Sequence, residues 1–519
     1  MASKKKKAAP RRSRGAVTRP PDELGHGQAE ERLRENLDQT VVAQPLLAAI
    51  RRDGPKARIR IIIDLNLTYP RGKGLQSAKV RAIKLAKEAI AAVDTEVPGC
   101  CVDVDKSNYA FQHVFARMTG NQIHLLLEKC GIRSEGLAQS PIYKVWPDNE
   151  VRGQLDKSVC TIKSDAALIS YTASGDGQYW AVIDSGIDGA HPHFKEHKNL
   201  IIEPPLHHMD FTGETVREIP AAEMPTDESG HGTHVAGIIA GERKEPVTVV
   251  TRRRDEAGDV YYSTRELPCI RGVAPKCKLV SLKVLGERGR GLESNLIAAL
   301  GYISTLNSQG RWPLIHGVNM SVGYEFDAEW FACGHSPLCV EVNRLVRSGV
   351  VVVVASGNTG YGFAQTQSAG AFKSGLDVTI NDPGNAELAI TVGSTHREHP
   401  HTYGVSYFSS KGPTGDGRMK PDLVAPGERV VSCAAGPKKT EILGKPGVTD
   451  FEYREESGTS MAAPHVAGAI AAFLSIRREF VGEPDRIKRI FLSTCTDLGR
   501  DRTFQGHGLL DLMRAIQSV

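Results

Sequence analysis

The sequence lacks the features that would place the protein in a membrane, a secretory pathway or a zinc-binding class. No apolar segment follows the basic N-terminus, so the pattern of a signal peptide is incomplete. No run approaches the roughly 18 apolar residues that a membrane-spanning helix needs. None of the ten cysteines forms a CxxC pair, which argues against a structural zinc site. We therefore expect no membrane partner and a cytoplasmic location, unless the protein is exported by a route that leaves no signal in its sequence.

Reduced thiols are expected in that compartment, and Cys333 and Cys339 are the pair expected to bond in an oxidising one. Net charge is also small, because 65 Lys and Arg face 60 Asp and Glu. Much of the basic excess lies in the first 19 residues. Residues 1–50 are therefore predicted to be a basic, disordered tail followed by a charged helix. A solubilising tail is preferred over a nucleic-acid contact, although electrostatics alone would permit one.

Residues 51–153 have the pattern of a small α+β domain. Residues 58–68 (RIRIIIDLNLT) are typical of a strand. Apolar residues then recur at helical spacing, namely Val80, Ile83, Ile90 and Val93. A second strand–helix–strand series follows, and Thr119 with Gln122 fits a capping box at the start of its helix. The order βαββαβ predicts a ferredoxin-like domain, which by itself indicates no function.

Residues 154–519 alternate apolar, glycine-bounded strands with helical segments. The predicted strands are 180–188, 278–286, 315–323, 351–358 and 388–394. Continuous Val and Ile runs separated by helices predict an α/β fold in which helices cover both faces of a mostly parallel sheet. Functional residues of such sheets gather where strands reach their carboxyl edge.

Four polar residues stand at such positions or at helix starts: Asp184, His231, Asn358 and Ser460. Acyl transfer needs a nucleophile, a base for its proton, an anion that orients the base, and donors for the oxyanion. Ser460 is the predicted nucleophile, His231 the base and Asp184 the orienting anion. The Asn358 amide and the Ser460 backbone N–H are the predicted oxyanion donors. Alone, each residue could be an ordinary cap or core residue; together they predict a serine hydrolase.

The motifs that hold these residues are VIDSGID, HGTHVAG, ASGN and GTSMAAPHVAG. With them the chain resembles the subtilisin-like serine proteases, the subtilase family or peptidase S8, in which the triad has the order Asp, His, Ser. The resemblance covers residues 154–519 and implies a serine endopeptidase. The domain at 51–153 resembles the family's propeptide, which implies an autoinhibited precursor, an intramolecular inhibitor and processing near residues 146–153.

The resemblance also implies a substrate cleft. Its walls would offer backbone hydrogen bonds to an extended polypeptide from Leu285, Gly286, Ser321, Val322 and Gly323. The insertion at 242–269 predicts a hairpin. Surface decoration is the preferred interpretation of this hairpin, ahead of a rim for the cleft or a docking site for a partner.

No metal site is predicted. His234 lies near His231 on one helical face but has no recognisable third ligand, so a packing role is preferred. His191–His193 and His207–His208 also suggest a metal, but the first pair resembles a loop that the family places after its catalytic aspartate, so a structural role is preferred. His465 is interpreted as a helix-packing residue. The chemistry requires no cofactor, and the family resemblance leaves structural calcium open without placing it. Two rival functions stay open: the same protease as a partner-regulated intracellular module, and a catalytically silent protein that only binds peptides.

Overall fold

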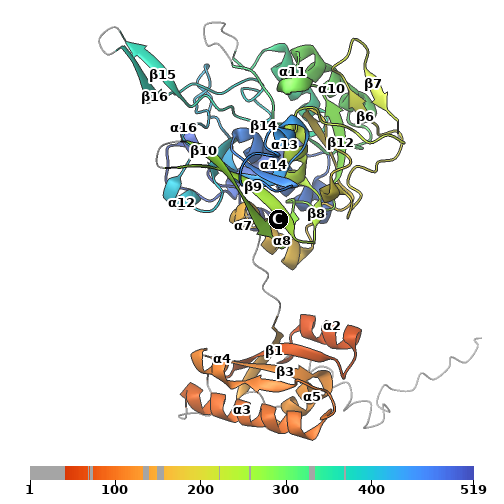
Figure 1. Cartoon of the computed structure of the whole chain (residues 1–519), viewed down its shortest axis with the longest axis vertical. Helices are drawn as coiled ribbons and strands as arrows, with labels where there is room; N and C mark the ends of the chain where they lie inside the picture. The colour runs from red at the N-terminus through yellow and green to blue at the C-terminus, as the bar shows by residue number, and fades with distance from the viewer. Residues whose placement is uncertain are drawn as a thin grey trace, which may run out of the picture. The chain divides into compact units, whose positions relative to one another are not determined.

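The computed structural model describes residues 41–67, 69, 74–110, 112–131, 139–148, 157–220, 222–255, 259–325, 333–366 and 370–519. The chain divides into two compact units, Met1–Arg152 and Gly153–Val519. Each unit has its own hydrophobic core. Figure 1 shows the helices and strands of both units. The predicted basic tail at residues 1–40 lies outside the described residues.

The N-terminal unit is a four-stranded antiparallel sheet in the order β2-β3-β1-β4. Its elements follow the chain as β1 (Arg58–Leu65), α3 (Gly74–Ala92), β2 (Cys101–Asp103), α4 (Val104–Tyr109), β3 (His113–Thr119), α5 (Gly120–Lys129) and β4 (Ile142–Pro147). Apart from the short α4, this is the predicted βαββαβ order, and its strand order is ferredoxin-like. The predicted capping box is confirmed: the Gln122 N–H donates to Thr119 Oγ1 at 3.2 Å, and the Thr119 N–H donates to Gln122 Oε1 at 2.9 Å.

The start of this unit differs from the prediction. Helix α2 (Gln44–Asp53) buries Leu46, Leu47 and Ile50 in the unit's core, and Val42 bridges to Val145 of β4. Residues 41–50 therefore pack with this domain, so in the structure it begins before the predicted boundary at residue 51. Because charged residues precede this stretch, the sequence pattern did not indicate the short apolar face of α2. Burial of that face against the sheet stabilises the helix.

The C-terminal unit is built on an eight-stranded sheet with the order β18-β17-β14-β13-β5-β12-β6-β7. All strands are parallel to their neighbours except the edge strand β7. The five predicted strands lie in it as β5 (Tyr179–Asp184), β12 (Lys278–Lys283), β13 (Gly317–Met320), β14 (Val351–Ala355) and β17 (Ile390–His396). The sheet is completed by β18 (Leu423–Glu428), β6 (His208–Asp210) and β7 (Arg217–Ile219).

Helices cover both faces of this sheet, as predicted. Helices α9 (His231–Ile239) and α14 (Thr459–Ile476) contribute to one core, and α10 (Glu293–Leu306) and α11 (Pro337–Arg347) to the other. Strand β14 contributes to both, with Val353 in the first core and Val352 in the second, because successive side chains of a strand point to opposite faces. Among the described residues α14 alone has the length and apolar composition of a membrane span, and 83% of it is buried inside the protein.

The insertion at 242–269 forms a hairpin, as predicted. Strands β9 (Val247–Arg254) and β10 (Val260–Leu267) pair antiparallel along their whole length. Strand β9 also pairs with β20 (Tyr453–Glu456), which in turn pairs with β19 (Val430–Cys433). Because β20 runs directly into α14, the hairpin belongs to a sheet that leads to Ser460, which differs from the preferred interpretation as surface decoration.

Candidate active site

The four predicted site residues meet at the carboxyl edge of the large sheet. Asp184 is the last residue of β5, and Asn358 follows β14 by three residues. His231 is the first residue of α9, and Ser460 is the second residue of α14. Because two strand ends and two helix N-termini converge, carboxylate, imidazole, amide and hydroxyl come together from four distant parts of the chain.

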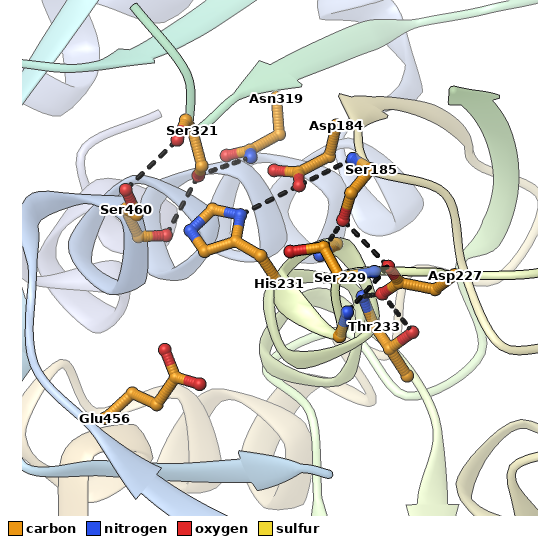
Figure 2. A network of polar contacts seen from close by, with 12 residues as sticks. Asp184, Ser185, Asp227, Ser229, His231, Thr233, Asn319, Ser321, Glu456 and Ser460 are labelled. Atoms are coloured by element: carbon orange, nitrogen blue, oxygen red, sulfur yellow. Dashed lines mark hydrogen bonds and ion pairs between the residues drawn. The ribbon is translucent and has the colours of Figure 1, made fainter. Parts of the chain in front are cut away.

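His231 is hydrogen bonded to Asp184, with 2.8 Å between Nδ1 and Oδ1 (Figure 2). The Asp184 carboxylate is fully buried, and Oδ1 also accepts from the Ser185 N–H at 2.7 Å. Burial would lower the pKa of His231, but the charge and the hydrogen bond of Asp184 outweigh it and raise that pKa above its ordinary value of 6.5. The contact therefore fixes the orientation of the ring and increases its basicity, leaving Nε2 as the working nitrogen.

A second buried carboxylate, Asp227, holds the start of helix α9. Its Oδ1 accepts from the N–H groups of Ser229 and Gly230 and from the Ser185 hydroxyl, at 2.7 to 3.0 Å. Its Oδ2 accepts from the N–H and the hydroxyl of Thr233, at 2.8 and 2.6 Å. Backbone N–H groups at a helix start otherwise lack partners, so Asp227 fixes the first turn that carries His231. Burial raises its pKa despite these donors.

Two glycines allow α9 to approach the sheet closely. A Cβ on Gly232 would lie 2.1 Å from the Gly186 carbonyl oxygen, and Gly230 has φ of 83°, a region that L side chains rarely adopt. The Gly232 N–H donates to the Ser185 hydroxyl at 3.0 Å. A larger residue at position 232 would push the helix, and with it His231, away from Asp184.

Ser460 is held by reciprocal bonds with Ser321. The Ser460 hydroxyl donates to the Ser321 carbonyl at 3.0 Å, and the Ser321 hydroxyl donates to the Ser460 carbonyl at 2.9 Å. Figure 2 shows the His231 ring between Ser460 and Asp184. In the described structure the Ser460 hydroxyl is thus bonded to Ser321.

Asn358 is oriented by the residue before the serine. Its Oδ1 accepts from the Thr459 N–H at 2.9 Å and from the Thr459 hydroxyl at 3.1 Å. Because the oxygen is used in this way, the NH₂ group is the end available to a ligand. The Ser460 N–H lies in the first turn of α14, where no carbonyl of the helix can reach it. Two donors are therefore available beside Ser460.

These groups open into a cleft of about 710 Å³. Its walls include four of the five predicted substrate-binding residues, Leu285, Ser321, Val322 and Gly323, together with His231, Asn358 and Ser460. Gly286 is not among the described lining residues, and its N–H donates to the Arg290 carbonyl at 2.9 Å. The backbone of this wall is therefore partly engaged within its own turn, so Gly286 cannot offer that N–H to a substrate.

The other histidines that invited a metal interpretation have local partners. His193 contacts the Tyr453 hydroxyl and the Gly237 carbonyl, each at 3.2 Å, and burial lowers its pKa to about 3. His465 contacts the Met461 carbonyl and the Ser158 hydroxyl, each at 2.8 Å. Within the described part of the chain no cluster of three or more His, Cys, Asp or Glu could hold a metal ion. None of the ten cysteines, Cys333 and Cys339 included, forms a disulfide bond in the structure.

Comparison with known proteins identifies the fold family. The family profile described as the subtilase family matches residues 175–508. This chain belongs to the subtilase family. The subtilase is 29% identical to the serine protease AprX of Bacillus subtilis over 401 residues, which cover 74% of each chain. It is 29% identical to subtilisin E of the same organism over 354 residues, 68% of each chain. It is 30% identical to pyrolysin of Pyrococcus furiosus over 325 residues, which cover 56% of this chain and 21% of pyrolysin. The protein is thus a subtilisin-like serine peptidase that acts on polypeptides.

Sequence reasoning missed two acidic residues of the subtilase site. Asp227 could have been found, because an acidic residue just before a helix start is a typical N-terminal signal. Glu456 could not, because its importance depends on ion pairs that only the folded structure reveals: with Lys438 Nζ at 2.9 Å, and with Arg454 Nε, two residues away on β20, at 3.0 Å. Burial would raise the pKa of Glu456, but the neighbouring charges of His234, Arg454 and Lys438 lower it to about 2.

Proposed function

We propose that this subtilase is an endopeptidase that cleaves proteins through an acyl-enzyme on Ser460. The observation that carries the proposal is the hydrogen bond between His231 and Asp184 at the mouth of the cleft that contains Ser460. A serine hydroxyl is a weak nucleophile unless a base is placed beside it. The pair supplies that base, and Asp184 fixes its tautomer with the proton on Nδ1.

In the first half of the reaction, Ser460 Oγ attacks the carbonyl carbon of the scissile bond and His231 Nε2 takes the hydroxyl proton. The negative charge that develops on the carbonyl oxygen is stabilised by the Asn358 NH₂ group and the Ser460 N–H. Donors of this kind need no reorganisation during the reaction, because Thr459 and the helix already orient them.

The tetrahedral intermediate collapses when His231 gives its proton to the leaving amine. A water then attacks the acyl carbon while His231 Nε2 takes its proton. His231 returns that proton to Ser460 Oγ as the bond between Oγ and the acyl carbon breaks and the acid product leaves. Asp184 stays ionised throughout and stabilises the imidazolium that forms in each half.

We also propose that the N-terminal domain acts as an intramolecular inhibitor and that the chain is made as an autoinhibited precursor. Support comes from the ferredoxin-like strand order of this domain and from its place directly before the protease unit. Processing is proposed near residues 146–153, most of which lie outside the described residues.

The second candidate function is the same protease regulated by a partner inside the cell. With it we propose that the protein is retained in the cytoplasm. Deleting residues 1–40, which precede the described part of the chain, tests this form. An unchanged substrate range and an unchanged location after cell fractionation would count against docking through the tail.

No calcium site is assigned, because the described residues offer no acidic cluster on which to place one. The triad chemistry needs none of the groups that a metal supplies. We therefore propose that peptide hydrolysis itself is independent of metal. Initial rates measured just after addition of a chelator should match those of untreated protein, and an immediate loss would contradict this.

A peptide-cleavage profile tests the function directly. The full chain and its Ser460→Ala variant are incubated with a diverse peptide mixture, and new termini are identified by mass spectrometry. Internal cleavage that depends on Ser460 is expected. A profile with no cleavage, before and after removal of the N-terminal domain, would instead favour a catalytically silent peptide-binding protein.

A further inference from the structure

A second cleft, of about 730 Å³, lies beside the candidate active site and has no role in the chemistry above. Its walls come from the β9–β10 hairpin, from β20, from the end of β18 with the residue after it (428–429), and from the turn at residue 442. The polar wall contains four arginines, three glutamates and Ser457, and the apolar part contains Val250, Tyr262 and Ile442. We call this region the arginine cleft after Arg252, Arg254, Arg429 and Arg454.

Two of the four arginines are already engaged. Arg429 Nε lies 2.8 Å from Glu455, which also contacts Arg397 at 3.1 Å. Arg454 Nε lies 3.0 Å from Glu456, whose other oxygen contacts Lys438. The third glutamate, Glu428, accepts from the Ser406 hydroxyl at 3.1 Å. The carboxylates of the cleft are thus satisfied by groups other than Arg252 and Arg254.

Arg252 and Arg254 carry the excess charge. Both are exposed, and no hydrogen bond or ion pair to either guanidinium exists within the described residues. They alternate along β9 and so point to the same face of the sheet, about 7 Å apart. Tyr262 lies opposite Arg252 on β10, and the Lys445 ammonium lies 5.0 Å from the Tyr262 ring centroid. The face of the hairpin that lines the cleft therefore has the cationic side chains of Arg252 and Arg254 next to an apolar surface.

The arginine cleft is close to the catalytic cleft. Lys438 lines the catalytic cleft and Glu456 lines the arginine cleft, and the two side chains form an ion pair. Ser457 also lines the arginine cleft, and Ser460 is three positions further along the chain, at most about 11 Å away. An extended polypeptide spans that distance with about four residues. One substrate chain could therefore occupy both clefts.

We infer that the arginine cleft is a second substrate-binding site that takes acidic stretches of a polypeptide lying a few residues from the scissile bond. Carboxylates at alternate positions of an extended chain match the spacing of Arg252 and Arg254, and guanidinium groups bind carboxylates through paired hydrogen bonds. Apolar side chains of the same stretch would pack on Val250, Tyr262 and Ile442. This inference rests on the proposed endopeptidase function for its kinetic test, but not for its binding test.

The kinetic test uses fluorogenic peptides with one cleavable core and an extension of Glu or of Gln, placed on either side of the core. The wild-type chain should have a lower KM for a Glu extension on one side. The Arg252→Gln/Arg254→Gln variant should raise that KM roughly tenfold, as expected for two lost charge-assisted contacts, and leave kcat and the Gln-extended peptides nearly unchanged. Whether the Glu extension lowers KM before or after the cleaved bond shows in which direction the substrate chain runs from the catalytic cleft to the arginine cleft.

Two matched variants control the kinetic test. Arg253→Gln removes the same charge from the opposite face of β9 and should leave every KM unchanged. Arg252→Lys/Arg254→Lys keeps the charge and should retain most of the preference for Glu. An equal KM for Glu and Gln extensions in the wild-type chain would overturn the inference, as would an equal effect of Arg253→Gln.

The binding test uses the Ser460→Ala chain and fluorescence anisotropy of the Glu-extended peptide. We expect the peptide to bind, and to bind more weakly at higher salt and in the chain that also has Arg252→Gln/Arg254→Gln. This result does not depend on cleavage, so it is expected even if the wild-type chain cleaves nothing and the proposed function fails. Displacement of the peptide by inorganic phosphate, with no dependence on the length of the Glu run, would overturn the inference in favour of a small-anion site.

Discussion

At the scale of single residues, the fully buried Asp184 carboxylate controls the candidate base. Its charge and hydrogen bond raise the pKa of His231, and the base works only when its ring is neutral. The value of kcat/KM should therefore rise with pH through an apparent pKa above 6.5. Measurement of initial rates across a pH series checks this. An acidic limb with its midpoint well below 6.5 would show that Asp184 does not act on His231 in this way.

The raised pKa of His231 also affects stability. Activity should rise with pH, but the contribution of His231 to the free energy of unfolding should fall with pH. The folded chain binds the His231 proton more tightly than the unfolded chain does. This contribution is fully present below 6.5 and is lost as the pH rises through the raised folded pKa. In the Ser460→Ala chain, which cannot digest itself, thermal unfolding at several pH values should show this loss. The His231→Gln/Ser460→Ala chain, which lacks the titrating group, should not.

A substitution at Asn358 can distinguish the role of its side-chain oxygen from that of its NH₂ group. Asn358→Asp keeps the oxygen that accepts from Thr459 but removes the NH₂ donors and adds negative charge. We expect kcat to fall by roughly 10²–10³ or more with little change in KM, because the lost donor serves the transition state. Circular dichroism should show an unchanged fold. A variant with near-normal kcat would remove Asn358 from the oxyanion site.

Sequence patterns singled out these residues because each stands at a strand end or a helix start, where parallel α/β folds place their functional groups. The patterns could not indicate that the Ser460 hydroxyl bonds to Ser321, or that the Gly286 N–H is used by Arg290, because both depend on local geometry. Glu456 escaped notice for a similar reason, since its ion pair with Lys438 joins two separate elements and its ion pair with Arg454 depends on how both side chains lie on β20.

At the scale of elements, the first turn of α9 determines where His231 stands. Asp227→Ala removes five hydrogen bonds from this buried turn and should lower the free energy of unfolding by about 2–4 kcal/mol. It should also reduce kcat, because His231 loses its fixed position. Chemical denaturation and steady-state kinetics measure the two effects.

Asp501→Ala is the matched control, because Asp501 caps the short helix α16 (Arg502–Gln505) and is exposed. It should cost at most about 1 kcal/mol and leave kcat unchanged. Equal losses of kcat in the two variants would mean that capping acts only through general stability and not through the position of His231.

Five strands of the large sheet could be predicted because continuous Val and Ile runs bounded by glycine are typical of strands buried on both faces. The three-residue strands β6 and β7 and the proline-containing β18 have no such run and were not predicted. A charged helix was predicted before residue 51, but the packing of α2 in the core of the domain was not, because the burial of a ten-residue helix depends on its contacts with the sheet. The hairpin was predicted from its turn, but its pairing with β20 was not, since such pairing depends on contacts distant in sequence.

At the scale of the whole molecule, the chain divides into two compact units at residues 152–153, and we predict that it is cleaved near this division. Incubation of the purified wild-type chain should produce new N-termini near residues 146–153, and the Ser460→Ala chain should stay intact. Mixing the two chains distinguishes cleavage within one molecule from cleavage between molecules, because only the latter would cut the variant. An intact wild-type chain that hydrolyses peptides would show that activity does not need processing.

The central claim is that Ser460 is a nucleophile activated by His231 and Asp184, and covalent labelling with a fluorophosphonate probe tests it most directly. Peptide mapping by mass spectrometry should place the label on Ser460 of the wild-type chain, tested with the N-terminal domain present and removed. Labelling should slow greatly in Asp184→Asn and disappear in Ser460→Ala. No label on Ser460 even after removal of the N-terminal domain, or equal labelling of the wild-type and Asp184→Asn chains, would contradict the claim.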